Sequence, residues 1–353
     1  MRGVGPPSLV GPRIGKKRLL VQGKLGPVDR TATVARLKNT QAARFGMRIY
    51  GLGRALDAKG SILGVVGDMG PIETLREQEA QQASLPRARG QAFLRVKQNA
   101  RTEIADLRQQ GSLKLVFPRQ RASALPMILV NTAGGVTGGD AFRFEAEIGR
   151  DASLNLTTQA SERIYRSVSG QAGEIQAQIH VAPGGRLTWL PQETIVFDGA
   201  ALKRRLVVDL APAAECLLLE SVVFGRAAMR ETIQRIVWRD EIIVNRDGAP
   251  VFWDRQTINE ANFNGPAAVV SRGDHKAMAV FVLASGSAGD RLEKIRDLAQ
   301  SLANAAIEIG VSALSEDLLT IRILASDGYT LRKAMLPLTH GLTGEDLPKV
   351  WML

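Results

Sequence analysis

Cysteine and histidine are almost missing from this chain of 353 residues, which has one cysteine, Cys216, and three histidines. A single cysteine excludes an internal disulfide and is typical of a protein in a reducing compartment. The histidines His180, His275 and His340 lie far apart and form no HxH or HExxH pair, and no CxxC is present. A high-affinity zinc or nickel site built by this chain alone is therefore not expected.

Long apolar runs and common catalytic loops are also missing. No apolar run approaches the roughly 18–20 residues that span a bilayer, so no membrane span is expected. The basic N-terminus has no long apolar stretch after it, which argues against a secretory signal and favours a cytoplasmic protein. The P-loop, the GxGxxG that opens a helix and the GxSxG elbow are absent. A Ser/His/Asp triad or a pair of glycosidase carboxylates, assembled in space, stays open.

Charge is unevenly distributed, with a net value of +11 from 46 Lys and Arg against 35 Asp and Glu. Residues 1–84 hold 14 basic and 6 acidic residues, whereas residues 85–353 hold 32 and 29. A nucleic-acid surface needs a basic stripe interleaved with aromatic residues, and residues 85–353 contain none. We expect neither a nucleic-acid nor a membrane partner. A nucleic-acid binder, as an alternative, would depend on residues 1–84.

Residues 1–84 differ from the rest in composition, being rich in Gly, Ala, Arg and Gln and interrupted by Pro6-Pro7, Gly11-Pro12 and Gly26-Pro27. Little periodicity is present, although a short helix near 73–83 is compatible with the pattern. We expect a poorly ordered basic extension, of the kind that a start codon assigned too far upstream would create. A targeting or interaction arm is the alternative.

Residues 85–353 show closely spaced segments in which apolar and polar residues alternate. In Ala141–Ile148, for example, Phe142, Phe144, Ala146 and Ile148 share one face. Turn signals separate such segments about every ten residues, which predicts a mainly β domain built as a sandwich, barrel or β-solenoid. Further strands are predicted at Met127–Val130, Glu174–Val181, Arg186–Leu190, Leu202–Leu210, Cys216–Phe224, Thr232–Trp238, Glu241–Val244, Val251–Thr257 and Leu318–Leu324.

Helical periodicity is clear only near the end of the chain. Asp290–Ile309 places its apolar residues on one face and predicts an amphipathic helix. A second helix is predicted over Tyr329–Leu336, where Pro337 interrupts it.

The segment Asn131–Asp140, NTAGGVTGGD, is the strongest candidate for a special turn. Its glycines permit positive φ and close backbone approach, and its amides could hold an anion. A strand follows instead of a helix, so a tight strand-to-strand turn is favoured over a nucleotide loop. Asp140 could cap this turn through backbone N–H groups or face an open channel as a weak metal ligand. The glycines are Gly134, Gly135, Gly138 and Gly139.

Two further segments and two isolated acids complete the candidate sites. In Thr157–Ser167, basic and aromatic residues beside serines suit an interface, a polar network or an ordinary strand edge. Glu193, in Trp189–Gly199, needs a partner if buried, either an arginine or a metal. Glu220 and Asp254 lie on apolar strands, where a carboxylate must be paired or must line a wet cavity.

Five segments, taken in chain order, resemble one family. They are LVNTAGGVTGGD (residues 129–140), TTQASERIYRS (157–167), WLPQETIVFDGA (189–200), GRAAMRE (225–231) and LTGEDLPKVW (342–351). Together they resemble the UreD (UreH) family of urease accessory proteins over residues 85–353. The resemblance implies a non-enzymatic chaperone with a β-helix-like stack of short strands and two helices near the C-terminus. It also implies that the chain binds apo-urease and, with UreF and the GTPase UreG, delivers nickel to the urease active site.

The resemblance implies no tightly bound cofactor, only transient Ni²⁺ that passes through a polar internal tunnel. Single oxygen donors suit such transit, because the ion must be held weakly enough to leave. We therefore expect Asp140, Glu220, Asp254 and Glu193 to line the nickel path. We expect Ser161, Tyr165, Arg166 and the four turn glycines to serve structural or interface roles.

Two positions depart from the family pattern, and one function from another class remains an alternative. Arg230 precedes Glu231 where the family usually has glycine, and Asp254 stands where many members have glutamate. The alternative is a β-solenoid carbohydrate-active enzyme, which would rest on strand spacing and scattered carboxylates. Substrate turnover in the absence of urease would favour that alternative.

Overall fold

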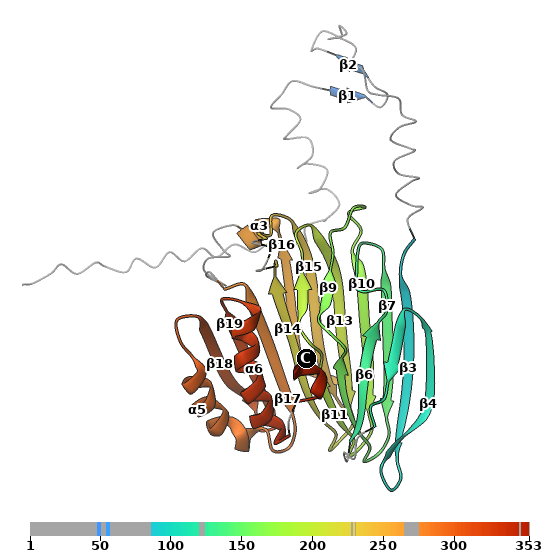
Figure 1. Ribbon diagram of the computed structural model, residues 1–353, viewed down its shortest axis with the longest axis vertical. Helices are drawn as coiled ribbons and strands as arrows, with labels where there is room; N and C mark the ends of the chain where they lie inside the picture. Colours follow the sequence, from blue (N-terminus) through green and yellow to red (C-terminus); the bar gives the residue numbers. More distant parts are fainter. Residues whose placement is uncertain are drawn as a thin grey trace, which may run out of the picture. The chain divides into compact units, whose positions relative to one another are not determined.

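Strands that alternate between two sheets build the protein, as the computed structural model shows (Figure 1). The structure describes residues 48–50, 54–56, 86–119, 124–226, 229, 231–264, 275–345 and 347–352. Each central turn of the chain adds one strand to each sheet: β7 (Ala141–Ile148) and β8 (Ser153–Thr158), β10 (Gly173–Val181) and β11 (Arg186–Leu190), β13 (Ala200–Leu210) and β14 (Glu215–Phe224). Successive turns pair in parallel, so the predicted β-helix-like stack is confirmed.

Antiparallel strands complete both sheets. Sheet 1 has the order β16-β15-β13-β10-β7-β3-β4 and also contains β3 (Arg89–Gln98), β4 (Thr102–Gly111), β15 (Ile236–Arg246) and β16 (Ala249–Asn259). Sheet 2 has the order β18-β19-β17-β14-β11-β8-β6-β5 and also contains β5 (Leu113–Val116), β6 (Leu125–Asn131), β17 (Ala277–Ala284), β18 (Ile307–Ser315) and β19 (Leu318–Ala325). The short strands β9 (Glu162–Ile164) and β12 (Thr194–Val196) pair with each other, and β12 pairs with β14.

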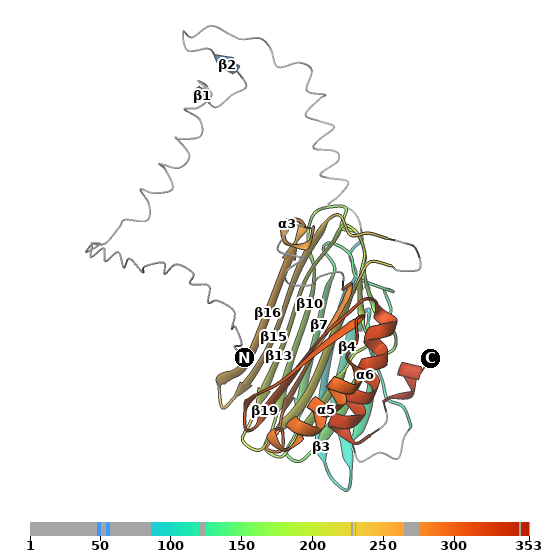
Figure 2. The same ribbon diagram turned by 90° about the vertical axis from the view of Figure 1, so that its left-hand side faces the viewer.

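Two apolar layers hold the domain together. The larger layer lies between the sheets, where alternate residues of each strand point inwards. The second layer lies between the outer face of sheet 2 and the helices α5 (Leu292–Leu302) and α6 (Gly328–Thr343), which pack side by side (Figure 2). The strands of sheet 2 near the helices are therefore apolar on both faces, as in β14, where only Glu215 and Val223 are not buried.

Helix α6 continues through Pro337, contrary to the prediction that this proline ends it. Asp327 accepts a hydrogen bond from the Thr330 N–H at 2.8 Å and caps the start, and Gly344 ends the helix with φ of 71°. A proline inside a helix costs about 3 kcal/mol. Burial of Leu338 and Leu342 beyond the proline offsets that cost.

Two other predictions about the elements are wrong in part. The helix predicted to reach Ile309 ends at Leu302, and Ile307 begins β18, which pairs with β19 along the sheet edge. The separate strands predicted over 232–238 and 241–244 form a single strand, β15. Asp240, which lies between the two predicted segments, points into the interior and is paired there with Arg204.

Four short elements remain: α3 (Glu260–Asn264), the 3-10 helices η2 (Gly289–Arg291) and η3 (Lys349–Met352), and the pair β1 (Arg48–Tyr50) and β2 (Arg54–Leu56). Apart from β1 and β2, residues 1–84 lie outside the described part of the chain. The expected poor order of this extension and its boundary near Leu85 stay predictions. Among the helices that the structure describes, none is long and apolar enough to cross a membrane.

Candidate functional site

The segments singled out in the sequence meet at one end of the stack. Parallel turns of a solenoid place equivalent strand ends next to each other, so the turns after β6, β9 and β12 become neighbours. Backbone hydrogen bonds join them: the Val136 N–H donates to the Arg163 carbonyl at 2.8 Å, and the Ser167 N–H donates to the Gly199 carbonyl at 2.9 Å. The Gly199 N–H donates to the Arg235 carbonyl at 2.7 Å.

The glycine-rich segment forms the tight turn predicted for it. Gly135 has φ of 149°, and a Cβ there would lie 2.3 Å from a ring carbon of Tyr165. A Cβ on Gly138 would lie 2.1 Å from the Ser167 hydroxyl. These contacts require glycine, because real Cβ atoms do not approach neighbours so closely. The turn and the segment Thr157–Ser167 are therefore fitted to each other.

Asp140 caps this turn. One carboxylate oxygen accepts from the Ala88 N–H and the other from the Thr137 N–H, each at 2.8 Å. The residue is 5% exposed. The capping role considered for Asp140 is thus confirmed. Its carboxylate lies outside the cavity described below.

Tyr165 and Arg166 fix the neighbouring turn. The Tyr165 hydroxyl donates to the Gly134 carbonyl at 3.1 Å, and its ring packs edge-on against Phe197 with centroids 5.0 Å apart. Arg166 forms an ion pair with Asp198 at 2.7 Å. Both side chains hold adjacent turns together. The structural or interface role expected for them stays a prediction.

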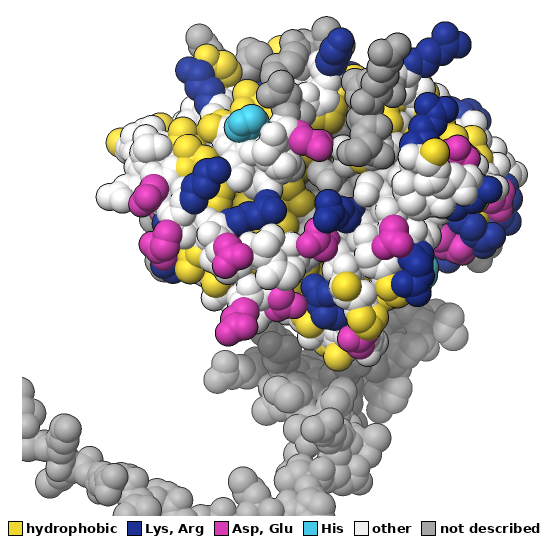
Figure 3. Space-filling model, turned by 90° about the horizontal axis from the view of Figure 1, so that it is seen from below, with side chains coloured by type: hydrophobic (Ala, Val, Ile, Leu, Met, Phe, Trp, Pro, Cys, Tyr) yellow, Lys and Arg dark blue, Asp and Glu magenta, His cyan; other side chains and the backbone are white. Residues whose placement is uncertain are grey.

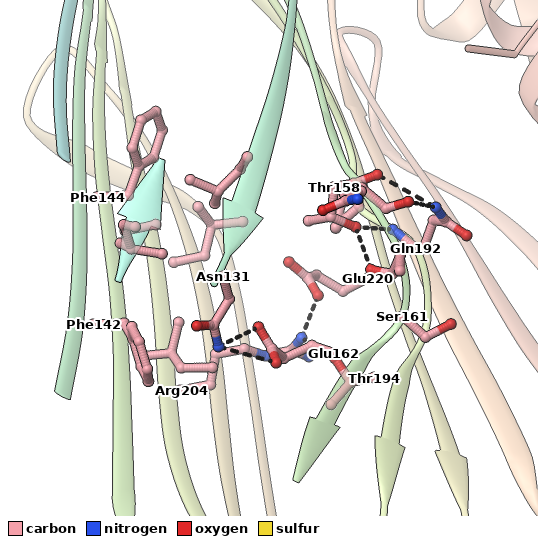
Figure 4. Close-up of a pocket in the computed structure, with 18 of the residues that line it drawn as sticks. Asn131, Phe142, Phe144, Thr158, Ser161, Glu162, Gln192, Thr194, Arg204 and Glu220 are labelled. Atoms are coloured by element: carbon pink, nitrogen blue, oxygen red, sulfur yellow. Dashed lines mark hydrogen bonds and ion pairs between the residues drawn. The ribbon is translucent and has the colours of Figure 1, made fainter. Parts of the chain in front are cut away.

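A cavity of about 290 Å³ lies between the two sheets (Figure 4). Its walls are largely apolar, with side chains from β7 and β10 of sheet 1 facing side chains from β5, β6 and β11 of sheet 2. A few polar groups converge on it, a combination typical of binding sites. They include Asn131, Ser161, Glu162, Thr194, Arg204 and Glu220, and the lining also contains Thr158, Gln159, Arg163, Gln176, Gln192 and Arg205.

Arg204 and Glu220 join the two sheets across this cavity. Arg204 Nη1 lies 2.5 Å from a Glu220 oxygen, and the same guanidinium makes two hydrogen bonds to Asp240, at 2.8 and 2.5 Å. The Trp189 indole N–H donates to Glu220 at 2.8 Å. Burial raises the pKa of Glu220 even though Arg204 lowers it. Burial alone would lower the pKa of Arg204, but Asp240 and Glu220 raise it above its ordinary value.

Glu162, which the sequence interpretation did not identify as a site residue, is the other acid of the cavity. Its two carboxylate oxygens each lie 3.2 Å from Asn131 Nδ2. Burial raises the pKa of Glu162 to about 7, while the Asn131 hydrogen bond lowers it only in part. A signal was present in the sequence, because Glu162 stands two positions before the apolar Ile164 and so shares its face of a strand.

Glu193 and Asp254, both expected on the nickel path, are paired with arginines elsewhere. Glu193 makes two hydrogen bonds to Arg332 of α6, at 2.7 and 2.6 Å, and accepts from the Ser161 hydroxyl at 3.4 Å. Asp254 on the edge strand β16 of sheet 1 pairs with Arg322 on β19 of sheet 2 at 2.9 Å and so connects the two sheets. Of the four acids predicted for the path, Glu220 alone lines the cavity.

The cavity offers oxygen donors without a preformed cage. In the part of the chain that the structure describes, no group of three or more His, Cys, Asp or Glu side chains is arranged to hold a metal ion. Glu162 and Glu220 are the carboxylates that line the cavity, and the Asn131 amide oxygen is one of its neutral donors that could also contact a cation. Such a set suits weak contact with a hard or borderline divalent ion.

Comparison with known proteins decides the family. The family model for the UreD urease accessory protein matches residues 88–352. The chain belongs to the UreD family of urease accessory proteins. It is 41% identical over 272 residues to a urease accessory protein UreD of Roseobacter denitrificans, with 76% of this chain and 96% of the relative covered. The UreD protein of Ruegeria pomeroyi is 38% identical over 250 residues, covering 70% and 94%, and that of Paracoccus denitrificans is 36% identical over 269 residues, covering 76% and 94%.

Membership of the UreD family gives this chain a role in urease maturation. The matched region contains both sheets, the cavity and the two C-terminal helices. The resemblance seen in the sequence is therefore confirmed.

Proposed function

We propose that this member of the UreD family is a non-enzymatic, cytoplasmic chaperone that delivers nickel to apo-urease together with UreF and the GTPase UreG. Family membership supports the maturation role, and the cavity with its acidic side chains supports the transit of a cation. Nickel is the cargo in this proposal and is never held as a resident cofactor. The absence of a P-loop in the sequence fits a division of labour in which UreG hydrolyses GTP.

The observation that carries this proposal is the difference between the two acids of the cavity. The Glu220 carboxylate is already paired with Arg204 and accepts a hydrogen bond from the Trp189 indole. Glu162 accepts a hydrogen bond from the neutral side-chain amide of Asn131 and another from the Arg163 backbone. A divalent ion would have to displace a guanidinium at Glu220, but only uncharged amide N–H groups at Glu162. We therefore assign the principal transient contact to Glu162 and a supporting electrostatic role to Glu220.

The other predicted acids take structural roles in this proposal. The oxygens of Asp140, Glu193 and Asp254 accept hydrogen bonds from backbone amides or guanidinium groups that hold the walls in place. Their replacement would act on the shape of the domain before it acted on nickel.

The volume of the cavity also fits the transit of a hydrated ion. A water occupies about 30 Å³ in the liquid, so a cavity of about 290 Å³ has room for an ion with several waters. A partly hydrated ion leaves more readily than one held by a full set of protein ligands, which suits delivery better than storage.

Co-expression tests the proposal. Urease subunits, the other accessory proteins and this chain are produced together, and urease activity and nickel content are measured with and without this chain. We expect both to depend on it. Glu162→Gln should lower nickel content while the complex still assembles, and Glu145→Gln, on the outer face of sheet 1, serves as the matched control. Full activity without this chain contradicts the proposal.

A further inference from the structure

Four turns at one end of the stack form a continuous surface, here called the motif surface. It consists of the described residues of four segments: 132–140, 163–170, 197–199 and 225–235. The backbone hydrogen bonds given above join each segment to the next. The cavity reaches this surface, because Gly134 and Arg163 line the cavity as well. The surface thus borders the site proposed for nickel.

The acids of the motif surface point inwards and cap backbone groups. Asp198 accepts from the N–H groups of Gln234 at 2.8 Å and Arg235 at 2.9 Å. Glu231 accepts from the Arg226 N–H at 3.1 Å and from its guanidinium at 3.0 Å. The side chains of Asp198 and Glu231 are 15% and 14% exposed, and Asp140 is buried.

The cations of the same surface point outwards. Arg163, Arg166, Arg226 and Arg235 are all exposed. Carboxylates beneath and guanidinium groups above form two layers, so an approaching molecule meets positive charge first. The described part of the motif surface presents arginine as its outermost charged side chain.

Apolar side chains lie among these arginines. Val168 and Met229 are each 70% exposed. The Arg226 guanidinium lies 4.4 Å from the centre of the Phe197 ring, whose edge-on partner is Tyr165. Arginine, methionine and aromatic residues are the types enriched where proteins bind one another. Exposed apolar side chains of this kind would gain nothing from a phosphate backbone, which favours a protein partner over a nucleic acid.

The opposite end of the stack differs. There, basic and acidic side chains are interspersed over the surface (Figure 3). Residues 85–353 hold 32 basic and 29 acidic residues, so the cationic layer at the motif surface is a local arrangement and does not follow from the overall charge.

We infer that the motif surface docks an acidic, partly apolar patch of a protein partner and so places that partner beside the cavity. The inference rests on the proposed function only in taking the partner from the urease maturation complex. Arginine side chains would pair with carboxylates of the partner, and Val168 and Met229 would be covered by its apolar side chains. Docking here would bring the partner next to Arg163 and Glu162, which follow each other in β9.

Charge reversal tests this inference. Full-length chain carrying Arg163→Glu and Arg235→Glu is compared with a matched variant carrying Arg101→Glu and Arg150→Glu, two exposed positions at the opposite end. Binding of each to purified apo-urease and to the purified co-expressed accessory proteins is measured at low and high salt. We expect the first variant to lose about tenfold in affinity and most of the salt dependence, and the second to stay within about twofold of wild type.

Further variants separate docking from damage to the fold. Arg163→Gln with Arg235→Gln should give an intermediate loss, and Val168→Ala with Met229→Ala should weaken binding without changing its salt dependence. Thermal unfolding confirms that each variant is folded. Three results would overturn the inference. They are equal losses of affinity in both charge-reversal variants, unchanged binding of the Arg163/Arg235 variant, and binding of a double-stranded DNA fragment by the motif surface in place of a protein.

The two proposals fail differently. If urease activation does not need the chain at all, the proposed function is wrong. If activation needs the chain but the Arg163/Arg235 variant activates and binds as wild type does, only the docking inference is wrong.

Discussion

The Glu162 carboxylate faces the Asn131 amide inside the cavity, with both of its oxygens 3.2 Å from Asn131 Nδ2. The two residues lie on different strands, β9 and β6, and are 31 positions apart in the chain. A neutral partner leaves a buried carboxylate poorly compensated, which is why the pKa of Glu162 rises to about 7.

This contact predicts a pH-dependent effect of Glu162→Gln on stability. Between the ordinary glutamate pKa, 4.5, and about 7, the folded state holds a proton that the unfolded state has released. The wild-type free energy of unfolding therefore falls as pH rises through this window and levels off above it. Glutamine does not titrate, so Glu162→Gln does not suffer this loss. Between pH 5 and pH 8 its free energy of unfolding should therefore rise relative to that of wild type, by roughly 3 kcal/mol at most.

Urea unfolding of wild type and Glu162→Gln at several pH values checks this. Subtracting the two curves cancels the contributions of the other titrating groups. A difference that stays constant between pH 5 and pH 8 would show that Glu162 does not titrate in this range.

Removing Arg204 should strongly destabilise the domain. Arg204→Met leaves the buried carboxylates of Glu220 and Asp240 without their cation, a change that costs about 3–5 kcal/mol. The neighbouring Arg205→Met is the control, because Arg205 points outwards, is 57% exposed and pairs with Glu241 at the surface. Its loss should change the free energy of unfolding by less than about 1 kcal/mol. Chemical denaturation measures both, and equal effects would contradict the burial argument.

Two adjacent glycines of the turn should respond differently to alanine. At Gly135 the new Cβ would collide with Tyr165, whereas at Gly134, with φ of 75°, nothing lies within 4 Å of it. Gly134→Ala should cost about 1–2 kcal/mol for its left-handed backbone, and Gly135→Ala clearly more. Thermal unfolding compares the two variants. A further Tyr165→Ala change should recover part of the loss in Gly135→Ala and none in Gly134→Ala.

Arg332 should hold the C-terminal segment against sheet 2. Its guanidinium binds Glu193, the Gln192 side chain at 2.9 Å and the Trp351 carbonyl at 2.9 Å, and the Trp351 indole N–H donates to Thr157 at 3.0 Å. Arg332→Ala should therefore lower hydrogen-exchange protection of the Trp351 amide and reduce the free energy of unfolding by about 3 kcal/mol. Lys333→Ala, at the next and exposed position, should leave both quantities nearly unchanged.

Much of the architecture follows from local patterns. Alternation over Ala141–Ile148 predicts β7 with the bounds observed, because a strand half-buried on a two-sheet core must repeat every two residues. Pro337 misled the prediction, since burial beyond a proline is a tertiary contribution that no local rule contains. The same holds for Asp240 in the middle of β15, whose burial is compensated by Arg204 of the neighbouring turn.

The sequence by itself determined the mainly β character of this protein, its late helices and its membership of the UreD family, because these depend on periodicity, turn residues and ordered motifs. Only the tertiary structure decided what each acid does. Asp140, Glu193, Glu220 and Asp254 look alike in the sequence, yet they respectively cap a turn, bind a helix, cross a cavity and join the two sheets. Their partners lie 2 to 139 positions away in the chain, and a carboxylate's role is fixed by which donor the fold brings within about 3 Å.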